Sequence, residues 1–174
     1  MLTPFRIDRM IWHYYPVLDS TQAQAKRLSG ISRSDAFVIV AAEQTAGHGQ
    51  YNRQFLSPRG GLYMTVAQTL PQTTVFHTPL SYRIGVRICQ YLQTLCPDIT
   101  MHYPNDIMLQ SKKLGGILCE SYPTHTRGHR RVYIGIGMNI NQTRPPLATA
   151  TTLRVHTNKS YTISTMCYKF ISCI

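Results

Sequence analysis

The sequence has few acidic residues and no long hydrophobic run. Of its 174 residues, 7 are Asp or Glu and 18 are Lys or Arg, which gives a formal net charge of +11. No apolar stretch approaches the roughly 20 residues that a membrane-spanning helix needs, and the first residues lack the apolar core of a secretory signal. We therefore expect a soluble cytoplasmic protein whose basic surface attracts nucleotide phosphates, nucleic acid or an acidic partner protein.

The five cysteines form no recognisable framework. Their number is odd, no two are arranged as Cys-x-x-Cys, and the seven histidines do not accompany them at metal-ligand spacing. This disfavours a disulfide scaffold or a zinc site and indicates free thiols in a reducing compartment. The sequence also lacks internal repeats, low-complexity segments, paired catalytic carboxylates and a Ser-His-Asp signature.

The apolar residues, 43% of the chain, are arranged as short strands and a few helices. A capped helix is predicted after Asp19-Ser20-Thr21, ending at Gly30, and a second at 79–95, stopped by Pro97. The predicted strands are 37–42, 62–70, 99–103, 107–109, 115–120 and 132–138. This order predicts an α+β fold with a mixed, mostly antiparallel sheet flanked by helices, and not a doubly wound Rossmann fold.

The last stretch, 162–174, has the pattern of a short helix. Met166, Phe170 and Ile171 give it an apolar side. A helix of about two turns is marginal in isolation. We therefore expect either that it docks on the domain or that it belongs to a larger piece of chain.

A glycine loop, Thr45–Arg53, follows the strand predicted at 37–42. Exposed backbone amides at Gly47 and Gly49 can hold an anion. The spacing matches neither GxxxxGK[ST] nor GxGxxG, so neither nucleotide fingerprint applies. Taken by itself, the loop is explained more readily by an ordinary turn than by an anion site.

Three further segments can likewise be either ordinary structural elements or parts of a ligand site. Pro104-Asn105-Asp106 is an ordinary β-turn that can also present an amide to a nucleotide. Lys113 precedes Leu-Gly-Gly-Ile-Leu, a strand whose glycines admit close approach of a backbone or a ligand. Gly135-Ile-Gly-Met-Asn139 is a strand end of the same kind.

Adenylate formation would use these residue types together. When a carboxylate attacks the α-phosphate of ATP, negative charge gathers between two anions, which Lys and Arg stabilise while Mg²⁺ neutralises the departing pyrophosphate. A mobile glycine loop can then keep water from the mixed anhydride. No general base is needed for this step, because the carboxylate is already a nucleophile.

Taken in order, these segments resemble the motifs of biotin–protein ligase catalytic domains, in the biotin/lipoate ligase superfamily. The family carries Ser-Thr-Asn, a Gly-Arg-Gly-Arg-x-Gly-Arg-x-Trp loop, a Lys-Trp-Pro-Asn-Asp turn, a Lys-Leu-x-Gly-Ile strand and a Gly-x-Gly-x-Asn strand. The corresponding segments here are Asp19–Gln22, Gly47–Phe55, His102–Asp106, Lys113–Ile117 and Gly135–Asn139. The resemblance implies a mixed sheet akin to that of class II aminoacyl-tRNA synthetases.

The resemblance also implies a role for each matching position. Lys113 would bind the carboxylate and the charge developing on the α-phosphate, and Arg53 would contact phosphates, which makes these two the candidate catalytic residues. Tyr63, with Leu62, would wall the channel for the biotin tail, and Phe55 would replace the family's Trp over the adenylate. The candidate biotin-binding residues are Ser20, Thr21, Gln22, Gln44, Gly47, His48, Gly49, Gln50, Tyr63 and Lys113. The candidate ATP-binding residues are Arg53, Phe55, Asn105 and Asn139. No side chain is expected to bind metal directly, so Mg²⁺ would arrive with ATP.

The implied function is to activate biotin with ATP as biotinyl-5'-adenylate and to pass it to a lysine of a biotin carboxyl carrier protein, an acetyl-CoA carboxylase subunit, or a similar acceptor domain. Two alternatives remain open: a lipoate or octanoate ligase or transferase of the same superfamily, and a non-catalytic biotin- or adenylate-binding paralogue. A nucleic-acid-binding module is supported by charge alone. The acceptor's identity and a homodimeric state are left open.

The sequence departs from the family pattern in places. His48 and Gln50 stand where the family has loop arginines that grip the adenylate. Losing one charge-assisted contact costs about 1.5–3 kcal/mol, so we expect a weaker hold on the intermediate. His102 and Tyr103 replace Lys-Trp and keep an aromatic. No helix-turn-helix precedes the motifs and no SH3-like domain follows them, so we expect residues 1–174 to be a single catalytic domain that binds neither DNA nor membrane.

Overall fold

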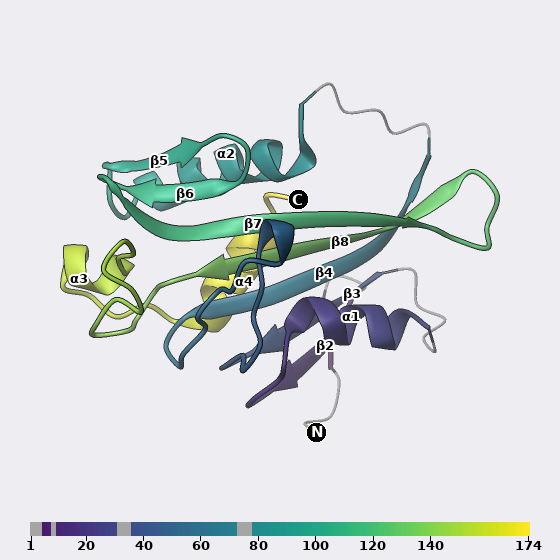
Figure 1. Ribbon diagram of the computed structural model, residues 1–174, viewed down its shortest axis with the longest axis horizontal. Helices are drawn as coiled ribbons and strands as arrows, with labels where there is room; N and C mark the ends of the chain where they lie inside the picture. The colour runs from purple at the N-terminus through teal and green to yellow at the C-terminus, as the bar shows by residue number, and fades with distance from the viewer. Residues whose placement is uncertain (1–4, 8–9, 31–35, 73–77) are drawn as a thin grey trace.

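The computed structural model describes residues 5–7, 10–30, 36–72 and 78–174. An eight-stranded sheet runs through them in the order β1-β2-β3-β4-β8-β7-β6-β5 (Figure 1). All neighbouring strands are antiparallel except β2 and β3, which are parallel. The predicted α+β class with a mixed, mostly antiparallel sheet is thus confirmed.

The predicted helices and strands are present with small changes at their ends. The strands are β1 (Phe5–Ile7), β2 (Met10–Tyr15), β3 (Ala36–Ala41), β4 (Leu62–Pro71), β5 (Ile99–His102), β6 (Asp106–Leu109), β7 (Lys112–Pro123) and β8 (His129–Met138). The helices are α1 (Thr21–Ser29), α2 (Leu80–Gln93), α3 (Leu153–Thr157) and α4 (Ile163–Ile171), with a 3-10 turn, η1, at Gln50–Asn52. The strands β1 and β2 were not predicted.

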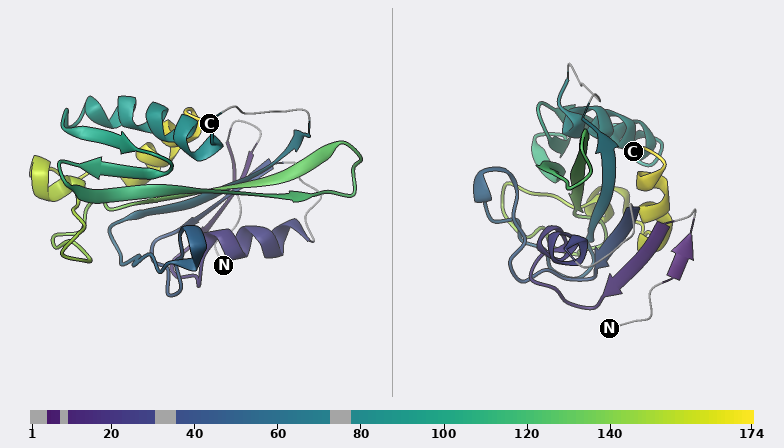
Figure 2. Two further views of the ribbon diagram at one scale, coloured as in Figure 1. Left: turned by 45° about the horizontal axis from the view of Figure 1, so that its top comes forward. Right: turned by 90° about the vertical axis from the view of Figure 1, so that its right-hand side faces the viewer.

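Alternation along the strands divides the side chains between the two faces of the sheet. On one face, Phe37, Ile39, Ala67 and Tyr133 form a cluster with Ala25 of α1. On the other face, residues of α2 and α4 pack with Val38 and Val40 of β3, Val66 of β4, and Ile134 and Ile136 of β8. The molecule therefore has three layers, with α1 on one side of the sheet and α2 and α4 on the other (Figure 2).

The helix α1 begins at buried polar residues. Ser20 caps it, because its Oγ accepts a hydrogen bond from the amide of Ala23 at 3.4 Å. Just before the cap, Asp19 pairs with Arg27 at 2.7 Å, and the hydrogen bond from that guanidinium lowers the pKa of Asp19 to about 2. The pair is exposed, so it adds little stability, but it ties the loop before the helix to the helix itself.

The terminal helix α4 docks on the sheet. Met166, Cys167 and Phe170 are buried, and the Tyr168 ring lies 4.9 Å from that of Trp12 between centroids. The first of the two expectations for this segment is therefore met. All five cysteines are free thiols, and no helix in the described ranges is long and apolar enough to cross a membrane.

Candidate active site

A cavity opens on the face of the sheet that α1 covers. It holds about 760 Å³ of empty space when the open solvent at its mouth is included. Its floor comes from β4, β7 and β8, and its walls from the start of α1, the glycine loop and the turn before β6. The lining residues are Ser20, Thr21, Gln22, Gln44, His48, Gly49, Gln50, Arg53, Gln54, Phe55, Thr65, Asn105, Asp106, Lys113, Gly116, Ile117, Leu118, Gly135, Ile136 and Gly137. All candidate residues from the sequence are among them except Gly47, Tyr63 and Asn139.

A row of hydrogen-bonded side chains lies where α1 meets β4. Thr21 donates to Gln44 Oε1 from both its amide and its hydroxyl, at 2.8 and 3.0 Å, and Gln44 Nε2 donates to Ser57 Oγ at 2.8 Å. Thr65 Oγ1 lies 2.9 Å from Thr21 Oγ1 and 3.0 Å from Gln22 Oε1. We call these five residues the polar row. Because each is fixed by its neighbours, they can bind polar groups of a ligand without rearrangement.

Two glycines of β8 make room for side chains that shape the cavity. A Cβ added at Gly135 would lie 2.7 Å from Gln22 Oε1, and one at Gly137 would lie 2.7 Å from the Phe55 ring. Real contacts of a Cβ are essentially never this short, so a larger residue at either position would displace a lining side chain. The Gly-x-Gly pattern at 135–137 therefore has a packing reason on the cavity face.

A β-bulge places Lys113 in the cavity. Leu114 is the extra residue of β7 opposite the step from Ile107 to Met108 of β6. Strict alternation from Gly116 would send the side chain of Lys113 to the opposite face of the sheet. The extra residue shifts the alternation by one, so Lys113 shares the cavity with Gly116.

The ammonium group of Lys113 is held by a carboxylate. Its Nζ lies 2.6 Å from Asp106 Oδ1, and the two side chains are 38% and 36% exposed. The turn that carries Asp106 is tied to β7, because the amide of Ile117 donates to the carbonyl of Asn105 at 2.9 Å. On the other side of Lys113, its backbone N–H donates to Thr149 O at 3.0 Å. Lys113 thus enters the cavity from a fixed backbone with a positioned charge.

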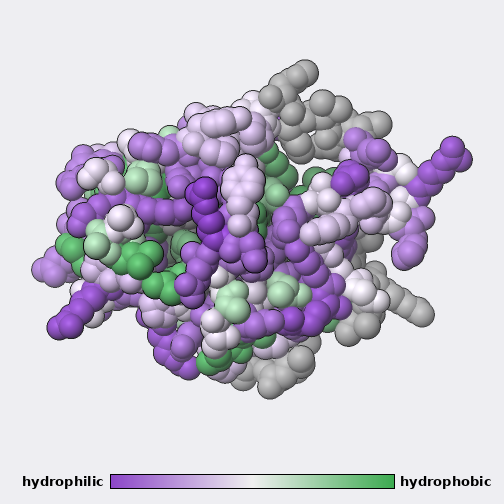
Figure 3. Space-filling view, viewed as in Figure 1, coloured by the Kyte–Doolittle hydropathy of each residue, from purple (hydrophilic) through white to green (hydrophobic). Residues whose placement is uncertain are grey.

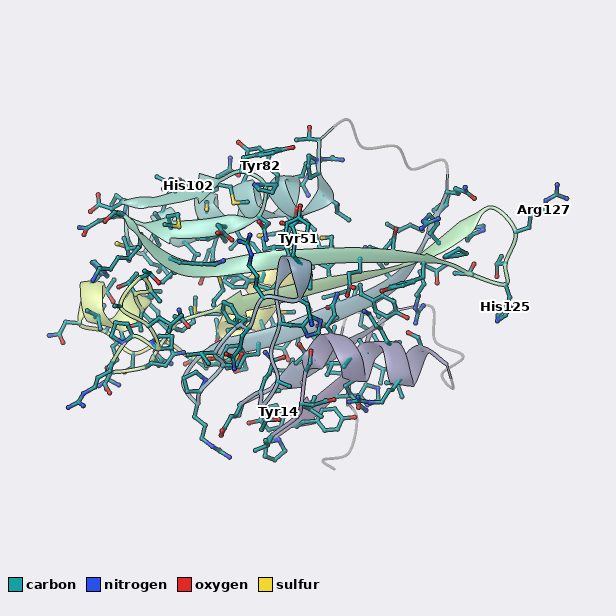
Figure 4. The ribbon with its side chains drawn as sticks, viewed as in Figure 1. Tyr14, Tyr51, Tyr82, His102, His125 and Arg127 are labelled. Atoms are coloured by element: carbon teal, nitrogen blue, oxygen red, sulfur yellow. The ribbon has the colours of Figure 1, made fainter. Side chains whose placement is uncertain are left out.

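The glycine loop forms a small hairpin beside the cavity. The amide of Phe55 donates to Gly47 O at 2.8 Å and that of Gly49 to Arg53 O at 2.7 Å. At the tip, Tyr51 and Asn52 both have φ of 57°, and Tyr51 is 79% exposed in front of β7 (Figure 4). Asn52 stands at the family's third loop glycine, and Asn tolerates this left-handed backbone better than most residues.

The loop also brings basic and polar groups to the cavity. His48, Gln50 and Arg53 line it. The Arg53 guanidinium lies 5.7 Å from the centre of the Tyr51 ring, and it pairs with no carboxylate among the residues that the structure describes. The cavity therefore holds an uncharged polar row at β4 and, two strands away at β7, a lysine ammonium. Hydrophilic residues cover most of this side of the molecule (Figure 3).

The structure places three candidate residues behind the cavity, in contrast to the sequence-based assignment. At Gly47, a Cβ would lie 2.6 Å from Phe55 O, so this glycine is required by packing. Tyr63 is buried with neighbouring Leu62 and donates its hydroxyl to a backbone carbonyl at 2.7 Å, while its ring lies 6.4 Å from that of Phe55. Asn139 is 2% exposed, and its backbone N–H donates to the carbonyl of the bulge residue Leu114 at 2.8 Å. All three support lining residues from the protein interior.

Residues 14–139 match the model of the biotin/lipoate A/B protein ligase family. The chain belongs to this family. Its relatives include the bifunctional ligase/repressor BirA of Bacillus subtilis (strain 168), 36% identical over 132 residues that cover 74% of this chain and 40% of that protein. The biotin–[acetyl-CoA-carboxylase] ligase of Paracoccus denitrificans is 30% identical over 125 residues, covering 70% and 51%. The chain thus matches about half or less of the length of these relatives.

Solved structures of the biotin protein ligases share the fold. That from Aquifex aeolicus in complex with biotin and ATP has a TM-score of 0.74 and 28% identity, covering 93% of this chain and 67% of that one. That from Leishmania major in complex with biotinyl-5-AMP has a TM-score of 0.76 and 28% identity, covering 93% and 72%. In both comparisons the likeness covers nearly the whole chain.

Proposed function

We propose that the chain carries the catalytic domain of a biotin–protein ligase. The observation that carries this proposal is the cavity with the uncharged polar row at β4 and the Lys113 ammonium at β7. Biotin has a matching shape, with a cyclic urea at one end and a carboxylate at the other. The dithiolane ring of lipoate offers the polar row no N–H or C=O group, so the row favours biotin. The solved relatives bound to biotin and ATP, or to biotinyl-5-AMP, support the same assignment.

In the first half-reaction, a carboxylate oxygen of biotin would attack the α-phosphorus of ATP, and the bond to pyrophosphate would break. The Lys113 ammonium would stabilise the charge that grows on the α-phosphate, and the Arg53 guanidinium would contact phosphate oxygens. Asp106 holds Lys113 in place before the substrates bind. Mg²⁺ would enter bound to ATP, since no group of three or more His, Cys, Asp or Glu in the described ranges is placed to hold a metal.

In the second half-reaction, the amine of an acceptor lysine would attack the acyl carbon of biotinyl-5'-adenylate, and AMP would leave. The Phe55 ring, which packs against Gly137, would cover the adenylate from the loop side. Asn105 would bind ATP. Gly47, Tyr63 and Asn139 would position these groups rather than contact the ligands. We place this catalytic domain in the cytoplasm, with a biotin carboxyl carrier protein as the acceptor class.

The proposal is tested by incubating the chain with ATP, Mg²⁺, biotin and a purified biotin carboxyl carrier domain, followed by streptavidin blotting. We expect labelling of the acceptor that requires both ATP and biotin and that stops when EDTA removes Mg²⁺. The control is an acceptor whose target lysine is replaced by arginine. Transfer of lipoate in place of biotin, detected by the mass of the acceptor, would assign the chain to the lipoate branch. Binding of biotin without any transfer would assign it to the non-catalytic class.

The altered glycine loop gives a second prediction. Since Gln50 lines the cavity where the family has an arginine, Gln50→Arg should add a charge-assisted contact to the adenylate phosphate. We expect biotinyl-5'-adenylate to dissociate about ten to a hundred times more slowly, as measured by filter binding of radiolabelled adenylate. Gln90→Arg, an equal charge change on the exposed side of α2, should leave the rate unaltered. An unchanged rate in Gln50→Arg would refute this account of the loop.

A further inference from the structure

The polar row continues past Gln22 to a carboxylate outside the cavity. Gln22 Nε2 donates to Glu120 Oε2 at 2.8 Å and, over a longer distance of 3.4 Å, to the backbone carbonyl of Tyr133. Lys26 Nζ lies 2.9 Å from each oxygen of Glu120, and the hydroxyl of Tyr122 donates to Oε1 at 3.1 Å. Glu120 is on β7 and Gln22 and Lys26 are on α1, so these contacts join the helix to the sheet directly beside the cavity.

Glu120 is ionised at neutral pH. Burial by itself would raise the pKa of its carboxyl group, but the hydrogen bonds from Lys26 and Gln22 outweigh burial, and the net shift of the pKa is downward. An ionised carboxylate accepts hydrogen bonds and donates none. Any polar group that faces Glu120 must therefore be a donor.

This requirement, together with the longer hydrogen bond to Tyr133 O, fixes the orientation of the Gln22 amide. Gln22 is 3% exposed, so few partners other than its protein neighbours and a ligand in the cavity are available to its amide. With its NH₂ group turned to Glu120, its Oε1 faces Thr65 at 3.0 Å and the cavity. A carbonyl oxygen has two lone pairs, and one of them remains for a ligand. The glycine at 135 leaves the space in which Oε1 lies.

We propose that Glu120 is a positioning residue that sets the substrate specificity of the cavity. By holding Gln22 in one amide orientation, it makes Oε1 an acceptor for an N–H group of the ligand ring. This inference rests on the proposed function and deepens it. A ring with N–H donors, such as the cyclic urea of biotin, satisfies Oε1, whereas the dithiolane of lipoate leaves a buried acceptor unpaired, which a polar site discriminates against.

A simpler role for Glu120 is to anchor α1 to β7 through Lys26. The two roles differ in how Glu120 reaches the ligand. Anchoring would change the whole cavity, including the part that binds ATP, and it would not depend on the side chain at position 22. Positioning acts through Gln22 alone and affects biotin alone.

The experiment is a double-mutant cycle with Glu120→Gln, Gln22→Leu and the double variant. The Kd for biotin is measured by isothermal titration without ATP, and the KM for ATP by pyrophosphate release. We expect Glu120→Gln to weaken biotin binding about ten- to a hundredfold with the KM for ATP unchanged, because an amide at position 120 can donate as well as accept and no longer requires a donor from Gln22. In the Gln22→Leu background, Glu120→Gln should add less than about a twofold change.

The matched control is Glu43→Gln, the same chemical change in an exposed ion pair with Arg59 at 3.1 Å, which should bind biotin like the wild type. Thermal midpoints establish that each variant folds, and if Glu120→Gln does not fold, Gln22→Leu must by itself weaken biotin tenfold. Wild-type affinity in Glu120→Gln, additive effects in the double variant, or an equal rise in the KM for ATP would each overturn the inference. A wild-type chain that binds no biotin would overturn the proposed function instead.

Discussion

Replacing Lys113 with alanine should remove nearly all biotin-dependent adenylate formation. Within the described cavity it is the lysine that reaches the ligand space, and the β-bulge and Asp106 position its ammonium before any substrate binds. Removing one such preorganised group from a reaction that develops negative charge lowers the rate by about 10²–10³-fold. The measurement is the rate of pyrophosphate release at saturating biotin and ATP.

The control for this variant is Lys112→Ala. Lys112 is the exposed neighbour at the start of β7 and lies outside the cavity. It carries the same charge, so a general loss of basic character would affect both variants equally. Near-normal pyrophosphate release by Lys113→Ala, or an equal loss in Lys112→Ala, would show that the positioned ammonium is not the source of catalysis.

Gly47→Ala should destabilise the chain far more than Gly49→Ala, although the family motif contains both glycines. A Cβ at Gly47 would meet Phe55 O and Ser57 Oγ, both at 2.6 Å, whereas a Cβ at Gly49 would have Arg53 O as its nearest neighbour at 3.8 Å, an ordinary contact. We expect Gly47→Ala to lower the free energy of unfolding by about 1–3 kcal/mol, and Gly49→Ala to change it by less than about 0.5 kcal/mol.

Urea unfolding of the two alanine variants provides this comparison. Because the displaced backbone carries Phe55, Gly47→Ala should also slow pyrophosphate release at least about tenfold. Equal unfolding free energies for the two variants would mean that both glycines serve the same purpose, and the distinction drawn from the loop geometry would be wrong.

The fold was largely predictable because its strands are short apolar runs separated by strong turn residues. The apolar runs at β3 and β4, for example, indicate buried strands without any further information. β2 was missed because Met10–Tyr15 mixes a histidine and two tyrosines with apolar residues, and its parallel pairing with β3 depends on contacts far apart in sequence. α4 was predicted as a helix, but its docking on the sheet follows from tertiary packing alone.

Only those site residues that belong to a recognisable motif could be predicted from the sequence. Lys113 was identified by its motif, but the reason that it points into the cavity is the extra residue Leu114, which no periodicity reveals. Thr65 was missed. Its one signal is a hydroxyl inside the apolar run of β4, at a position that alternation places on the α1 face. Tyr63 and Asn139 stand next to lining residues in sequence, yet burial turns their side chains into the protein interior.

The central claim is that this chain joins biotin to AMP. The most direct test is incubation with α-³²P-labelled ATP, Mg²⁺ and either biotin or lipoate, followed by chromatography of the acyl-adenylates. We predict labelled biotinyl-5'-adenylate with biotin and no labelled adenylate with lipoate. Labelled product with lipoate alone, or none with biotin, would contradict the account.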